Sequence, residues 1–155
     1  MLQIIVSAIL FCSTQGSQGW KGIQPLHTSR VDVERLLGTP FTPCKGLCSY
    51  EAKSEVVLVR YSGDPCTNND DNRWRVPANT VISVTVNLNN GPRFSSLRLN
   101  RKKFTKAKDP ELHGYTSYSS AELGVDYSVN AQGRVYSIDW FPSLKDEKAL
   151  QCGSE

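Results

Sequence analysis

Residues 124–140 read Gly-Val-Asp-Tyr-Ser-Val-Asn-Ala-Gln-Gly-Arg-Val-Tyr-Ser-Ile-Asp-Trp, and this stretch decides the fold class. Two runs with a period of two, 124–129 and 134–140, flank a four-residue turn that ends in glycine, the pattern of a β-hairpin. The apolar and aromatic side chains fall on one face: Val125, Tyr127, Tyr136, Ile138 and Trp140. The polar side chains fall on the other face, which we expect to be solvated: Asp126, Ser128, Ser137 and Asp139.

The sequence that precedes the hairpin, residues 55–120, predicts three further strands. Residues 55–61 are a β-branched run typical of a buried strand, and residues 80–88 alternate as in a half-buried one, with Ile82, Val84, Val86 and Leu88 inward. Residues 115–120 supply another strand directly before the hairpin. Polar turn formers at 63–72 separate the first two runs.

A short capped helix is predicted over residues 29–38. Ser29 can cap the first turn, with Asp32 three residues on, and Gly38 followed by Pro40 ends the helix. Its apolar face consists of Val33, Leu36 and Leu37. A helix this short must pack on a sheet to persist. The sequence therefore predicts one α+β domain over 20–155: an antiparallel sheet of four to six strands with one or two short helices packed on one face.

Residues 1–19 have the pattern of a cleavable signal peptide. They carry no charge, and 2–12 are almost wholly apolar but shorter than the roughly 20 residues that a membrane-spanning helix needs. Ser17 and Gly19 are the small residues that precede a cut at Trp20. No Lys or Arg precedes the apolar core, so a buried N-terminal strand stays an alternative, as does a lipid anchor at Cys12. We expect an exported chain, secreted or periplasmic, without a transmembrane helix after cleavage near Gly19/Trp20.

Removal of residues 1–19 leaves four cysteines, an even set that indicates two disulfides in an exported chain: Cys44, Cys48, Cys66 and Cys152. Cys44 and Cys48 enclose three residues, so a local bridge is geometrically easy, and the other two would then tie the middle of the domain to its C-terminus. The alternative is a four-thiolate zinc site, although Cys66 and Cys152 lack a near neighbour cysteine.

Positive charge is concentrated between residues 93 and 108. Seven of the 18 basic residues lie there with no acid among them, so the rest of the chain has 11 basic against 15 acidic residues. The candidate ligand-binding residues are Arg98, Arg101, Lys102, Lys103 and Lys106. Phe94 and Phe104 lie among the basic residues of 93–108, and cations interleaved with aromatic rings suit nucleic acid, whose bases stack on rings. The anions that an exported chain meets are instead lipid headgroups, envelope polymers or an acidic protein. The alternative is a solvated loop, or an edge strand whose lysines prevent aggregation.

Enzyme signatures are scarce, so we expect no catalytic residue, no cofactor and no metal. His27 lies just before the helix and His113 lies in a turn leading to a strand, and neither stands in a metal-binding or nucleophile pattern. Asp126 and Asp139 share a hairpin face, and paired carboxylates serve glycosidases. The predicted function is a non-enzymatic, exported binding or envelope-associated domain. The alternatives are a secreted hydrolase that uses these acids and a binder of anionic polymers, including nucleic acid, through residues 93–108.

Residues 20–40, Trp-Lys-Gly-Ile-Gln-Pro-Leu-His-Thr-Ser-Arg-Val-Asp-Val-Glu-Arg-Leu-Leu-Gly-Thr-Pro, resemble the opening of a family of exported bacterial proteins without assigned function. The likeness extends through 59–66 to 150–152, and it implies a bridge between Cys66 and Cys152 and a bacterial source. More loosely, the chain is similar to outer-membrane assembly lipoproteins (SmpA/OmlA-like) and the β-lactamase-inhibitor-protein fold, at Ser29, Val33, Leu37, Gly38, Pro40 and 133–135. The chain is longer and its lipid-attachment motif is poor, so the assembly role does not transfer.

Overall fold

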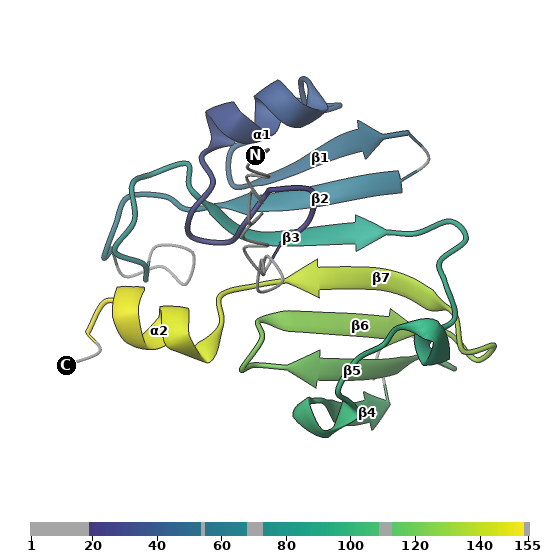
Figure 1. Ribbon diagram of the computed structural model, residues 1–155. Coiled ribbons are helices and arrows are strands. Elements are labelled where there is room, and N and C mark those ends of the chain that lie inside the picture. The colour runs from purple at the N-terminus through teal and green to yellow at the C-terminus, as the bar shows by residue number, and fades with distance from the viewer. Residues whose placement is uncertain (1–18, 54, 68–72, 109–112, 154–155) are drawn as a thin grey trace, which may run out of the picture.

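The computed structural model describes residues 19–53, 55–67, 73–108 and 113–153, and its centre is one antiparallel sheet (Figure 1). The strand order is β1-β2-β3-β7-β6-β5-β4. The strands are β1 (Leu47–Ala52), β2 (Glu55–Tyr61), β3 (Val81–Asn87), β4 (Thr105–Lys108), β5 (Thr116–Ser120), β6 (Val125–Val129) and β7 (Val135–Trp140). The helices are α1 (Arg30–Leu37), α2 (Leu144–Leu150) and the 3-10 turns η2 (Phe94–Ser96) and η3 (Arg101–Lys103). The α+β class is confirmed, but the predicted four to six strands are too few, because the described residues form seven.

Helix α1 has the predicted caps. The Ser29 hydroxyl accepts a hydrogen bond from the Asp32 amide at 3.3 Å, and Gly38 takes φ +82° while its N–H donates to the Glu34 carbonyl. Val33 is fully buried and Leu37 packs against the same cluster, whereas Leu36, predicted to face inward, is 58 % exposed. The buried stripe is therefore narrower than the sequence suggests.

One row of side chains crosses all seven strands on the same face. Paired residues of neighbouring antiparallel strands point to the same side, so the register defines this row. Its members are Tyr50, Val57, Val86, Ile138, Tyr127, Tyr118 and Lys106. Over β1–β3 this face packs with α1 and with Trp20 and Ile23, and over β7–β5 it packs with the segment 94–99. Both halves of the core thus lie on one side of the sheet.

The predicted hairpin is present with a different register at its turn. Val129 pairs with Val135, and the register shift there is a β-bulge at Tyr136. The bulge brings Val135 into the core, at 1 % exposure, and leaves Tyr136 41 % exposed. The assignment of Tyr136 to the buried face is therefore wrong, because strict alternation does not survive an extra residue.

Apart from Leu58, the middle row of the opposite face consists of polar side chains. The row contains Ser49, Leu58, Thr85, Asp139, Asp126, Ser119 and Thr105. Our expectation of full solvation is wrong for part of this face. Ser137, in the neighbouring row, is buried, and Asp139 is only partly accessible.

Both disulfides are as predicted, Cys44–Cys48 and Cys66–Cys152, with Cα–Cα distances of 5.3 and 5.6 Å. They overturn the zinc alternative, since each of the four sulfurs is bonded to one other in two separate disulfides and no thiolate among them is left to bind a metal. Near Cys152 the chain end is also fixed by backbone hydrogen bonds, with Cys152 N–H donating to Arg73 and Arg75 N–H to Leu150. Leu150 of α2 packs there on a small second core made of Leu26, Trp74, Val76 and Ile82.

Disulfides form and persist in oxidising compartments, so the two bridges agree with the expected export. The apolar segment 2–12, Ser17 and the lipid-anchor alternative at Cys12 lie outside the described residues. Trp20, the expected first residue after cleavage, belongs to the core. None of the described helices is long and apolar enough to cross a membrane.

Candidate functional site

The cations of the basic segment gather at the β4 end of the sheet. Arg98 lies between η2 and η3, η3 supplies Arg101, Lys102 and Lys103, and β4 supplies Lys106 and Lys108. All six side chains are exposed. We call these six residues the basic edge. Arg93 lies apart from it, in a backbone bridge with Arg134 beside the β6–β7 turn.

Apolar side chains between the cations hold this segment to the sheet. The Phe94 ring stacks on Tyr118 with centroids 4.1 Å apart and lies 5.6 Å from Tyr127, and Phe104 contacts Tyr127 at 5.8 Å. Leu97 and Leu99 pack on the same cluster. Because the apolar residues face the sheet, the cations between them face solvent. Phe94 is buried, so its ring is not free to stack on a base as the nucleic-acid hypothesis requires.

The path of the segment depends on Gly91. A Cβ at this position would overlap the backbone carbonyl oxygen of Val135. Hydrogen bonds fix the close approach, since Val135 N–H donates to the Pro92 carbonyl and Phe94 N–H donates to the Gly133 carbonyl, both at 2.9 Å. Glycine is required here because only a residue without a side chain lets two backbones come this close.

Most cations of the basic edge have no acidic partner among the residues that the structure describes. Within the described part of the chain, Lys103 is the one member that pairs with an acid, at 2.7 Å from Glu122 Oε1. Arg101 instead lies over the Phe94 ring and Lys106 over the Tyr118 ring, each at 5.8 Å. These aromatic contacts orient the cations without neutralising them.

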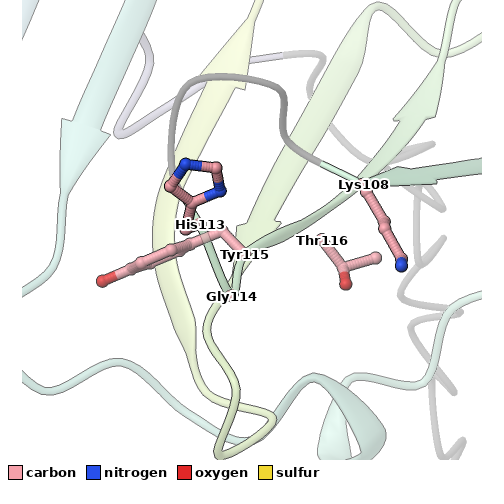
Figure 2. Close-up of a pocket in the computed structure, with 5 residues that line it drawn as sticks. All are labelled: Lys108, His113, Gly114, Tyr115 and Thr116. Atoms are coloured by element: carbon pink, nitrogen blue, oxygen red, sulfur yellow. The ribbon is translucent and has the colours of Figure 1, made fainter.

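A hollow of about 310 Å³ lies at the end of β4, where β5 begins (Figure 2). It is lined by Lys108, His113, Gly114, Tyr115 and Thr116. Figure 2 shows Lys108 beside Thr116 on one side of Gly114, and His113 with Tyr115 on the other. His113 precedes a strand, as predicted. The other histidine, His27, is exposed and lies 3.9 Å from Asp146.

Asp126 and Asp139 are directly opposed across β6 and β7, as the shared face predicted. Each carboxylate accepts a hydroxyl hydrogen bond, Asp126 from Ser117 at 2.6 Å and Asp139 from Thr85. Burial raises the pKa of Asp139 most, the Thr85 bond opposes this, and the nearby Asp126 charge raises the pKa further. Neither aspartate lines the hollow of Figure 2. Among the residues that the structure describes, no group of three or more His, Cys, Asp or Glu could hold a metal.

The structure brings together all five residues predicted for ligand binding, Arg98, Arg101, Lys102, Lys103 and Lys106, and adds Lys108. Lys108 belongs to the same strand as Lys106 and is two residues away, so the two side chains share a face. The alternation in Thr-Lys-Ala-Lys at 105–108 is the signal that could have identified it from the sequence.

No protein-family model, curated protein or solved structure matches this chain. The function is therefore argued from the geometry and charge of the basic edge.

Proposed function

We propose that this chain is an exported, non-enzymatic binding domain that holds an anionic macromolecule on the basic edge. The observation that carries the proposal is that five of the six exposed cations of the basic edge, all except Lys103, have no acidic partner among the described residues. A positive surface of this kind raises the local concentration of an anion and its association rate.

The anchoring of the segment supports a binding role further. Phe94 and Phe104 fix the backbone that carries the cations, so their positions are set before a partner arrives. A surface ordered in advance loses less conformational entropy when it binds.

A hydrolase that uses Asp126 and Asp139 is the less favoured function. Both carboxylates already accept hydrogen bonds from neighbouring hydroxyl groups of the sheet. The hollow that the structure describes is lined by other residues. Loss of a hydrolytic activity in both Asp126→Asn and Asp139→Asn, with folding intact, would be the observation in its favour.

Two independent features support the proposal that the chain is exported. The apolar run at 2–12 followed by Ser17 and Gly19 suits a signal peptide cut before Trp20, and the two disulfides suit an oxidising compartment outside the cytoplasm. The resemblance of residues 20–40 to exported bacterial proteins points the same way. In this location an acidic protein or an envelope polymer is a more accessible anion than nucleic acid.

The test is neutralisation of the basic edge. The variant R101Q/K102Q/K103Q/K106Q is compared with the unmodified protein for binding to polyglutamate, by titration at low and at physiological salt. We expect a loss of about tenfold or more in affinity, because the attraction comes from these charges, and a weaker dependence on salt.

The matched control removes four exposed cations elsewhere, K45Q/K53Q/K145Q/K148Q. It has the same net charge as the first variant, so a nonspecific effect of charge would weaken binding equally in both. Equal affinities for the two variants would contradict the proposal. Unfolding curves of both variants show whether the fold is kept.

A further inference from the structure

We propose that β4 is a receptor edge to which an extended segment of an acidic protein adds as an eighth strand, with carboxylates opposite Lys106 and Lys108. This inference rests on the proposed function, because it names the class of partner and the way in which that partner binds. It begins from the position of β4 at the end of the sheet (Figure 1).

The two edges of the sheet differ in what occupies them. At β1, the backbone N–H of Phe41 donates to the Ser49 carbonyl at 2.9 Å, so part of that edge is already paired. In the described part of the chain, β4 pairs with β5 alone, and all four of its residues are exposed. A strand with one neighbour leaves the N–H and C=O groups of every second residue directed outward, where another chain can pair with them.

The side chains of β4 specify the charge of the partner strand. Lys106 and Lys108 project to one face, and Thr105 and Ala107 to the other. A strand added beside β4 places its own alternate side chains level with these residues. The fitting sequence therefore has an acid at every second position, with small or hydroxyl side chains between.

Lys106 remains available for such a pairing. Its ammonium group lies over the Tyr118 ring at 5.8 Å and has no acidic partner among the described residues. Arg101 and Lys102 precede the strand in η3 and extend the positive charge beyond it. Among the described residues, neither Lys106 nor Lys108 has an ion pair that a partner acid would have to break.

The same lysines disfavour a second copy of this chain as the occupant. Two β4 strands side by side would oppose Lys106 and Lys108 with lysines of the other copy, and opposed like charges destabilise a strand pair. Lysines on an edge strand are a known defence against self-association. This charge repulsion does not act against an acidic strand. The charge of β4 therefore favours a different, acidic protein as partner over a second copy of this chain.

The experiment uses labelled peptides of about eight residues, long enough to span β4 and its flanks. One peptide alternates Glu and Thr, and its isomer has the same composition with the glutamates in one block. Two further versions of the alternating peptide carry backbone N-methyl groups, either on every Glu or on every Thr. Binding to the full chain is measured by fluorescence anisotropy.

We expect the alternating peptide to bind about tenfold more tightly than its block isomer, because only alternation places the acids on the lysine face. Methylation of one set of residues should abolish binding while methylation of the other leaves it within about twofold, since only one set directs its N–H groups to β4. The variant K106E/K108E should lose the Glu–Thr peptide and bind a Lys–Thr peptide.

Equal binding of the two isomers, together with equal effects of the two methylation patterns, would overturn strand addition. The proposed function would still stand if R101Q/K102Q/K103Q/K106Q lost polyglutamate and the charge-matched control did not. Failure of that neutralisation test would overturn both proposals. A dimer of the chain alone, in sedimentation, that K106E/K108E abolished would assign the edge to a second copy and also overturn this inference.

Discussion

Asp139 lies on β7 directly opposite Asp126 on β6, and Thr85 donates a hydroxyl hydrogen bond to its carboxylate. Opposed like charges on a strand pair destabilise the pair, and burial adds to the cost of ionising Asp139. Both effects raise its pKa in the folded state. A raised pKa means that the folded protein binds the proton more tightly than the unfolded chain does. The contribution to stability is therefore present at low pH and is lost as the pH rises through the folded pKa.

Asp139→Asn should stabilise the protein at pH 7 by about 0.2–1 kcal/mol, the range for a directly opposed cross-strand pair. The Asn side chain keeps an oxygen for Thr85 while removing the charge. Between neutral and mildly acidic pH, the variant should lack the gain in stability that the unmodified protein has from protonation of Asp139. Urea unfolding at several pH values measures both effects. Asp64→Asn, in an exposed loop, is the control. An Asp139→Asn variant less stable at pH 7 would show that the charge is not a cost.

Among the elements, the segment from Gly91 to Phe104 connects the interior strand β3 to the edge strand β4 and carries most of the basic edge. Its start depends on the close contact of Gly91 with β7, and its middle depends on Phe94. Two contacts within the fold therefore position the residues of the basic edge.

Gly91→Ala should destabilise the protein by about 1–3 kcal/mol, the usual cost of overpacking, because the added methyl group overlaps the Val135 carbonyl oxygen. The shift should also displace Phe94 and weaken polyglutamate binding. Gly46→Ala is the control, since a Cβ there meets nothing within 4 Å. Denaturant unfolding and the polyglutamate titration test the prediction, and equal results for the two alanine variants would contradict it.

Local signals predicted α1, β2, β3, β5, β6 and β7, because caps, turns and alternation are encoded within each element. Helix α2 also has such a signal in the sequence, the capping box of Ser143 and Asp146. Strand β4 differs, since its four exposed residues contain no apolar periodicity and are extended because β5 offers a partner. The charge of the candidate site was thus readable from the sequence. Its place on an open edge depends on pairing between distant residues.

At the scale of the whole molecule, Cys66–Cys152 joins the loop after β2 to the segment just beyond α2 across a sequence separation of 86, whereas Cys44–Cys48 spans a separation of 4. In the chain-entropy model, closing the longer loop removes far more conformational entropy from the unfolded chain. The two bridges therefore differ in what they do for stability.

C66S/C152S should lower the free energy of unfolding by about 4–5 kcal/mol, and C44S/C48S by about 2 kcal/mol, as the loop lengths predict in the chain-entropy model. Guanidinium unfolding of the two double variants, each against the oxidised protein, measures the difference. Equal losses, or a larger loss for the short loop, would show that packing around Cys48 outweighs chain entropy.

The long bridge also determines how the protein responds to proteolysis. Strands β3 to β7, and with them the entire basic edge, lie between Cys66 and Cys152 in the chain. A single cleavage of the backbone anywhere in that interval yields two fragments that remain covalently joined. The nicked molecule keeps its mass apart from one added water, and strands on both sides of the cut stay tethered to the same sheet. Only cleavage followed by reduction of Cys66–Cys152 removes the covalent link between the two fragments.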